Sequence, residues 1–120
     1  MINDADKQLL TDAAAVMGYR IITIQHNKIH VAAPGGINFH WNPLVDDGDA
    51  FRLAVTLQLP LDYASAFQFE DGPLTKCSSY WDPRESCYRP FIQLHQGNPL
   101  AATRRAIVKA AAHIGKRHHD

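Results

Sequence analysis

The sequence predicts an α+β fold in which three helices pack on one small antiparallel sheet, in the order α-β-β-α-β-β-α. Segments with a capping residue and helical spacing of apolar residues occur near the start, in the middle and at the end of the chain. Short runs rich in β-branched and aromatic residues, bounded by turn residues, lie between them. Helices grouped on an antiparallel sheet are typical of a layered α+β domain.

The composition is that of one globular domain covering residues 1–120. Of these 120 residues, 46% are hydrophobic and 20% charged, which is enough apolar material for one core. The sequence contains no internal repeat and no linker long enough to divide it. Twelve basic and twelve acidic residues cancel, so the overall charge indicates neither a nucleic-acid nor a membrane partner.

The sequence favours a cytoplasmic location. No apolar run approaches the roughly 18 residues needed to cross a bilayer, and the N-terminus is polar and acidic where a signal peptide would be basic and then apolar. Two cysteines, Cys77 and Cys87, are too few for a disulfide scaffold. In a reducing compartment we expect them to be thiols.

The first third of the chain predicts a helix followed by a hairpin. Asn3 caps the helix, which continues to Met17 and stops at Gly18, a residue suited to the left-handed conformation at a helix end. Runs rich in β-branched residues then indicate two strands joined by a short polar turn, and a third short strand after a Pro-Gly-Gly break. These strands are expected at residues 19–25, 29–31 and 37–41.

A second helix is expected from Asp46, its cap, to Gln58, and Pro60 ends it. Two further strands follow at residues 63–69 and 88–94, the latter on a sheet edge because it contains Pro90.

The last helix is the clearest element of the sequence. Asn98 caps it and Pro99 occupies the first-turn position that proline tolerates best. Its apolar residues cluster on one face, and we expect it to run to about Ile114 and to end before Gly115.

The longest irregular stretch is predicted between Asp71 and Cys87, which is long for a loop without a function. It contains Tyr80, Trp81 and Arg84, residue types enriched at binding hot spots. We therefore expect this stretch to carry a partner-binding surface. The alternative is that Trp81 folds back and covers the sheet, because tryptophan is highly buried on average.

Charged residues of the last helix suggest two roles. Arg104 lies at the edge of the apolar stripe, and Asp47 occupies the matching edge of the second helix, which predicts an ion pair between them. Arg105, Lys109 and Lys116 are expected on one exposed stripe. Such a stripe is what an amphipathic helix needs for solvation, so nucleic-acid binding is the weaker interpretation.

No motif of a known chemistry is present, which predicts a protein without cofactor, metal or catalysis. The acidic start of the second helix lacks the spacing of a calcium loop, and capping explains it. Seven histidines and two cysteines lack the local spacing of a zinc site. A thiolate pair of Cys77 or Cys87 with His95 would be the basis of a small hydrolase, but no nucleophile elbow or phosphate loop accompanies it.

Two stretches carry a resemblance to a known group. Trp41-Asn42-Pro43-Leu44 with the acidic cap and apolar residues of the second helix, and the alanine-rich last helix, together resemble small proteins of tailed phages and prophages described as phage α-β-α sandwich domains. The resemblance covers about a third of the chain. It implies a phage or prophage origin and a sandwich-like fold, and it implies no activity.

We therefore expect a non-enzymatic accessory protein that binds a host protein, for example as an inhibitor of host antiviral defence of the anti-CRISPR kind. One alternative is a small-ligand or nucleotide-signal binder (a sponge) that uses Arg104 and Arg105 with aromatic residues. The other is the cysteine or histidine hydrolase.

Overall fold

The structure is a computed structural model that describes residues 2–26, 28–64, 72–82, 84 and 87–119. It contains helices and strands in the order α-β-β-β-α-β-β-β-α. The helices are α1 (Asp4–Val16), α2 (Asp47–Thr56) and α3 (Pro99–His119). The strands are β1 (Arg20–Gln25), β2 (Lys28–Ala32), β3 (Asn38–His40), β4 (Leu61–Ala64), β5 (Leu74–Asp82) and β6 (Cys87–Leu94).

The α+β class and the three helices are confirmed, but the strands form two sheets where one was predicted. Sheet A has the order β1-β2-β3 and sheet B the order β4-β5-β6, and the pairings in each are antiparallel. Each sheet is a meander whose consecutive strands are neighbours. Helix α2 lies between the two meanders in the chain and separates them.

The prediction of a long irregular stretch between Asp71 and Cys87 was wrong over most of its length, because β5 occupies Leu74–Asp82 and is the central strand of sheet B. Two of its residues at alternate positions, Thr75 and Cys77, are fully buried, and they are polar or small. Lys76 lies between them on the other face. A strand with so few β-branched or large apolar residues gives a weak periodic signal, which is why the pattern indicated a loop.

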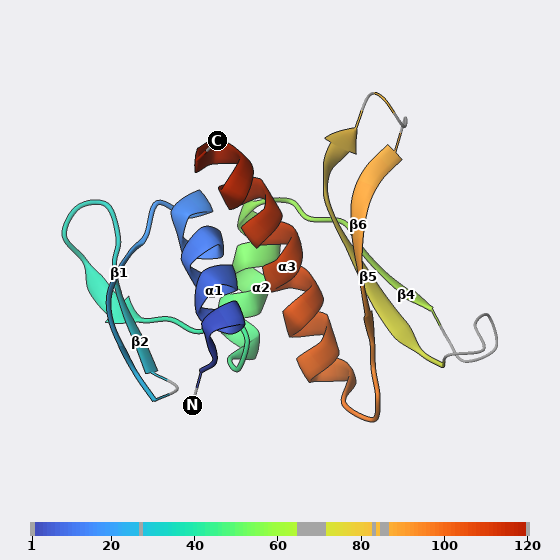
Figure 1. Cartoon of the computed structure of the whole chain (residues 1–120), viewed down its shortest axis with the longest axis horizontal. Helices are drawn as coiled ribbons and strands as arrows, with labels where there is room; N and C mark the ends of the chain where they lie inside the picture. Colours follow the sequence, from blue (N-terminus) through green and yellow to red (C-terminus); the bar gives the residue numbers. More distant parts are fainter. Residues whose placement is uncertain (1, 27, 65–71, 83, 85–86, 120) are drawn as a thin grey trace.

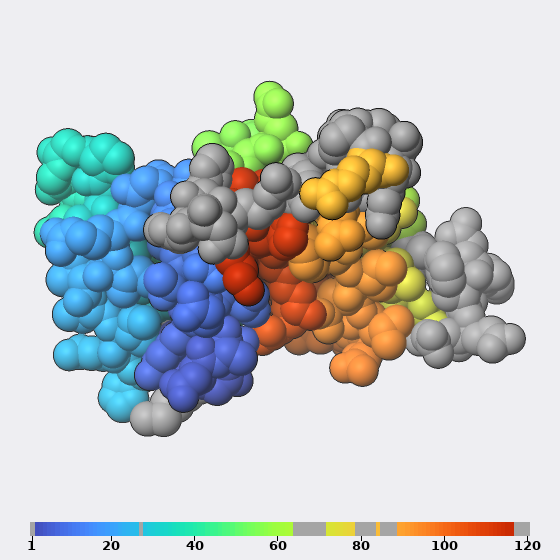
Figure 2. All heavy atoms as spheres, turned by 45° about the horizontal axis from the view of Figure 1, so that its top comes forward, coloured from blue at the N-terminus to red at the C-terminus, as the bar shows by residue number. Residues whose placement is uncertain are grey.

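The helices form a middle layer between the two sheets (Figure 1). Helix α1 contacts β1 on one side, while α3 contacts α1, α2, β5 and β6, so α3 is the element that joins the two halves of the molecule. Figure 2 shows the same order at the surface, with the blue and cyan residues of α1 and sheet A at one side and the orange residues of sheet B at the other. None of the described helices is long and apolar enough to cross a membrane.

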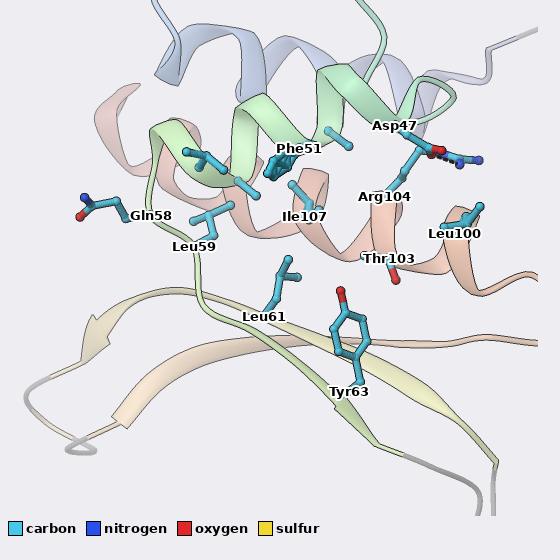
Figure 3. A pocket seen from close by; sticks show the side chains of 13 residues that line it. Asp47, Phe51, Gln58, Leu59, Leu61, Tyr63, Leu100, Thr103, Arg104 and Ile107 are labelled. Carbon is cyan, nitrogen blue, oxygen red and sulfur yellow. Dashed lines mark hydrogen bonds and ion pairs between the residues drawn. The ribbon is translucent and has the colours of Figure 1, made fainter.

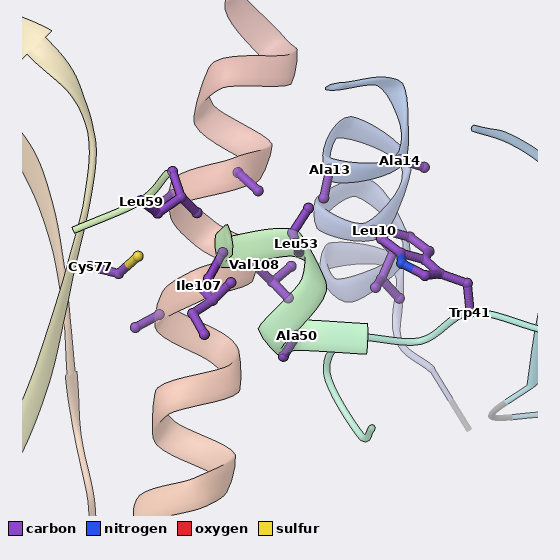
Figure 4. Close-up of a cluster of buried hydrophobic side chains, with 14 of the residues drawn as sticks. Leu10, Ala13, Ala14, Trp41, Ala50, Leu53, Leu59, Cys77, Ile107 and Val108 are labelled. Carbon is purple, nitrogen blue, oxygen red and sulfur yellow. The ribbon is translucent and has the colours of Figure 1, made fainter. Parts of the chain in front are cut away.

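One cluster of buried side chains runs through all these layers (Figure 4). It begins at Ile29 and Val31 in sheet A, continues through Leu10 and Leu53 between the helices, and ends at Cys77 in sheet B. The part contributed by α3 consists mainly of alanine. Small side chains allow α3 to approach neighbours on several sides, and this is why a helix rich in alanine occupies the centre.

The predicted helix starts are confirmed in atomic detail. The side-chain oxygens of Asn3, Asp46 and Asn98 accept hydrogen bonds from the backbone N–H groups of the residue three positions on, at 2.8, 2.8 and 3.1 Å. Gly18 follows the end of α1 with a φ of 76°, the left-handed conformation expected there.

The predicted end of the last helix was wrong, because α3 continues through Gly115 to His119. Gly115 is buried where α3 crosses α1, and a Cβ atom there would overlap the carbonyl oxygen of Asp12 and lie 2.8 Å from a methyl carbon of Val16. The glycine therefore permits a close approach of two helices and does not mark a helix end.

We predict that Gly115→Ala destabilises the protein by about 2 kcal/mol or more, because overpacking at a helix crossing forces the helices apart. The intrinsic effect has the opposite sign, since alanine in a helix interior is favoured over glycine by about 1 kcal/mol. Urea unfolding of this variant beside Lys116→Ala, an exposed neighbour, measures the difference. Equal or higher stability of the Gly115 variant would contradict a close α1–α3 contact.

Candidate functional site

Exposed apolar side chains are concentrated at one place on the surface. Nine large hydrophobic residues are exposed among the described residues, and five of them line a single groove. These five are Phe51, Val55, Leu61, Tyr63 and Leu100. Single exposed apolar residues are normal on a protein surface, whereas a contiguous group of them marks an interaction site.

The groove lies between α2, α3 and β4 and has a volume of about 420 Å³. Figure 3 shows α2 above it and β4 below it, with the first half of α3 between them. The residues that line it are Asp47, Ala50, Phe51, Ala54, Val55, Gln58, Leu59, Leu61, Tyr63, Leu100, Thr103, Arg104 and Ile107. Nine of them are apolar or aromatic, which makes the groove a hydrophobic one.

The upper wall exists because α2 is apolar on two faces. Leu53 and Ala54 face the core and are buried, whereas Phe51 and Val55, four residues apart, are 60% and 59% exposed. Residues four apart lie on the same side of a helix, so these two side chains form one exposed apolar ridge. Burial in the monomer does not explain this second ridge.

The lower wall is formed by alternate residues of β4. Leu61 and Tyr63 lie opposite Cys77 and Thr75 of β5 in the antiparallel register. Opposed residues share a face of the sheet, and Thr75 contacts Thr103 of α3, so this is the face that α3 covers. Helix α3 covers β5 and β6 but leaves Leu61 and Tyr63 directed into the groove (Figure 3).

The predicted ion pair between Asp47 and Arg104 is confirmed and closes one end of the groove. Arg104 Nη1 lies 2.6 Å from Asp47 Oδ1, and Arg104 Nε donates to the backbone oxygen of Leu44 at 2.8 Å. The side chain of Arg104 is 18% exposed and that of Asp47 is 64% exposed. These are the two charged groups among the lining residues, and they neutralise each other.

Arg105 has a structural partner that the sequence analysis did not assign. Its two terminal nitrogens donate to the two carboxylate oxygens of Asp6 at 3.1 Å each, which ties α3 to α1. Lys109 donates to Gln93 Oε1 of β6 at 2.9 Å. The prediction of one exposed basic stripe is therefore wrong for these two half-buried residues, while Lys116 is exposed.

The acidic start of α2 acts as a cap and a small polar network. Asp49 is buried, and its Oδ2 accepts the backbone N–H of Asn42 at 2.9 Å while its Oδ1 accepts from Arg52 at 2.7 Å. The hydrogen bond with Asp49 raises the pKa of Arg52. Within the described part of the chain, no three histidine, cysteine or acidic side chains gather as they would around a metal ion.

Cys77 and His95 face different partners. His95 Nε2 lies 2.7 Å from Thr75 Oγ1, which in turn lies 2.9 Å from Thr103 Oγ1. Cys77 is fully buried, and burial raises the pKa of its thiol from 9.0 to about 12. A thiol with this pKa is almost fully protonated at neutral pH and is a poor nucleophile.

The two cysteines are also too far apart to be bonded to each other. Cys77 pairs with Phe91, whereas Cys87 pairs with Asp82, five residues further along β5. Five residues of strand span about 16 Å, and a disulfide requires Cα atoms within about 7 Å. Cys77 is accordingly a free thiol.

The predicted partner-binding residues lie at the end of β5 and just after it. Tyr80 and Trp81 belong to β5, with the backbone of Trp81 opposite Tyr88 of β6, and their side chains are outside the described part of the structure. Arg84 is exposed between β5 and β6. Their role in binding stays a prediction. Arg84 is not among the residues that line the groove, and the groove itself was not predicted from the sequence.

Comparisons of this chain with protein-family models, with curated proteins and with solved structures found no significant match. The groove therefore has to be interpreted from its own geometry and chemistry.

We predict that the Asp47–Arg104 pair contributes a coupling energy of about 1 kcal/mol, more than an average exposed pair, because Arg104 is largely buried and also bonds to Leu44. A double-mutant cycle of Asp47→Asn and Arg104→Gln, followed by urea unfolding, measures this energy. Asp62→Asn is the control, since Asp62 lies 4.0 Å from Lys76 in a more exposed pair, and it should change stability by under about 0.5 kcal/mol. Additive effects of the Asp47 and Arg104 substitutions would show that the contact is energetically silent.

We also predict that the Cys77 thiol does not react in the folded protein. A Cys87→Ser variant isolates it, and Ellman's reagent at pH 8 should label it only at the rate of unfolding, because reaction needs an exposed thiolate. Unfolding in urea should expose the Cys77 thiol, which should then react completely and without delay. Fast labelling in native buffer would mean that Cys77 is accessible and that β5 is not covered by α3.

Proposed function

We propose that this chain is a non-enzymatic binding protein whose groove between α2, α3 and β4 receives an apolar segment of another protein. The observation that carries this proposal is the concentration of exposed hydrophobic side chains in the groove. Phe51 and Leu100 are 60% and 62% exposed, on helices that are otherwise packed into the core. Their exposure lowers the solubility of the monomer and adds nothing to its stability. A partner that covers them is the simplest explanation of their apolar character.

The polar groups around the groove support binding in preference to catalysis. Arg104 is engaged by Asp47 and Leu44, and the hydroxyl of Thr103 is bonded to Thr75. Catalysis requires a titratable group within reach of the substrate and with a pKa suited to the reaction. The thiol of Cys77 is the described group with a strongly shifted pKa, and its shift is toward lower reactivity.

The arrangement of the two arginines gives less support to a binder of small anions. Arg104 points to α2 and pairs with Asp47, whereas Arg105 points to α1 and pairs with Asp6. A phosphate site needs basic groups that converge on one place. A groove of about 420 Å³ is within the size range of small-molecule pockets, so a bound apolar compound is an outcome that the test must recognise.

The resemblance to small phage and prophage proteins extends the proposal to the identity of the partner. On that basis the partner is a host protein, for example a component of an antiviral defence system that the chain would inhibit. Tyr80, Trp81 and Arg84 would then form a second contact region at the far end of sheet B. A partner that contacts both this region and the groove would be larger than a single peptide.

We predict that Phe51→Ser weakens partner binding at least about tenfold, because buried aromatic anchors at interfaces contribute about 2 kcal/mol or more. Ile37→Ser is the matched control, since Ile37 is 65% exposed and lies beside sheet A, away from the groove. Partners captured from a host lysate with the unaltered chain are purified, and calorimetry gives their affinity for all three proteins.

Two results would contradict the proposal. One is a partner that binds the Phe51 variant as tightly as the unaltered chain. The other is a small apolar compound found in the groove by native mass spectrometry and displaced by none of the captured proteins.

A further inference from the structure

The open edge of β4 has its hydrogen-bonding groups at known positions. Sheet B has the order β4-β5-β6, so β4 pairs with β5 alone among the described strands. The backbone N–H of Ser78 donates to the oxygen of Pro60 at 3.0 Å, which places this residue pair in a hydrogen-bonded position of the ladder. Such positions alternate in an antiparallel ladder. The N–H and C=O groups of Leu61 and Tyr63 therefore point away from β5, toward the open edge.

The same two residues direct their side chains into the apolar groove. Leu61 and Tyr63 are 38% and 61% exposed and face the side of the sheet on which α2 and α3 lie. At each of these positions the chain thus offers backbone groups along the edge and an apolar side chain beside it. A segment that used both would have to be extended, because only an extended backbone matches the spacing of a strand edge.

The other open edge of sheet B carries a block that β4 lacks. Pro90 of β6 lies opposite Ser78, whose N–H is directed to Pro60, the residue before β4. Pro90 is therefore at a position that faces the open edge of β6, where it has no N–H to donate. Proline at an edge is a common protection against further strand pairing. Pro60, the residue before β4, stands at a position directed toward β5, and the outward positions Leu61 and Tyr63 keep their N–H groups.

We propose that the groove receives an extended peptide segment of the partner, which adds to β4 as a fourth strand of sheet B. The proposal rests on the function proposed above and names its chemistry. Apolar side chains at positions i and i+2 of the segment would lie on the groove side and contact the ridge formed by Phe51 and Val55. A fourth strand would thereby cover the exposed face of α2, as α3 covers β5 and β6.

The charge on the other face of β4 indicates which residue type the peptide carries at position i+1, between its two apolar residues. Asp62 lies between Leu61 and Tyr63 on the far side of β4, and its side chain is 74% exposed. Its contact with Lys76 is long, at 4.0 Å. A cross-strand pair of opposite charge is favourable, so the peptide residue at position i+1 is basic. The preferred motif is apolar, basic, apolar.

Selection from a random heptapeptide library displayed on phage provides the probes, with counter-selection on the Phe51→Ser variant. The best peptides are then synthesised with a single N-methyl group at each position in turn, and fluorescence anisotropy gives their affinities. N-methylation removes one N–H donor and blocks close strand pairing. We expect losses of about tenfold or more at alternate positions, with smaller changes at the positions between them, because only every second amide faces β4.

The outcomes separate this inference from the function on which it rests. Peptides that need Phe51 and show the alternating losses, with the apolar-basic-apolar motif, support strand addition. Peptides that need Phe51 but lose affinity on N-methylation at every central position, and are helical by circular dichroism when bound, overturn strand addition and leave the groove function standing. No peptide that depends on Phe51, or concentration-dependent dimerisation through the groove in sedimentation, overturns both.

Discussion

The burial of α3 on several sides is the constraint on which the rest of the structure depends. Its residues Ala106, Val108, Ala110 and Ala111 are fully buried, and the helix contacts α1, α2 and sheet B. A helix that is apolar around most of its circumference has to lie in the centre of a protein. Its small side chains set the distances to its neighbours, with Gly115 allowing the closest approach. The ion pairs of Arg104 and Arg105 then fix its rotation between α2 and α1.

The candidate site is a consequence of this arrangement. Helix α3 covers β5 and β6 but leaves β4 uncovered. Helix α2 also packs against α3. The space between α2 and β4 is the groove, and neither wall has a partner within the described part of the chain. The buried core does not include the five exposed apolar residues of the groove, and this excess of exposed apolar surface is the basis of the proposed binding role. A fourth strand would complete sheet B beneath α2.

Elements with strong local signals could be predicted from the sequence, and those defined by long-range contacts could not. The caps of all three helices and the Asp47–Arg104 pair followed from spacing on helix faces. Strand β5 was missed because Thr75 and Cys77 give little apolar alternation, although a polar strand is stable once α3 covers it. The groove was missed because it joins residues of α2, β4 and α3, and its one local signal was the pair Phe51 and Val55 outside the inward stripe of α2.

Within the described part of the chain, β4 is paired on one side and open on the other, beside the groove. Amide hydrogen exchange of the isolated protein, followed residue by residue by NMR, tests this most directly. We predict slow exchange for Asp62, whose N–H is directed to β5, and fast exchange for Leu61 and Tyr63, whose N–H groups face solvent. Equal protection of all three amides, or protection of Tyr63 above Asp62, would contradict it, because the edge would then be covered within the protein itself.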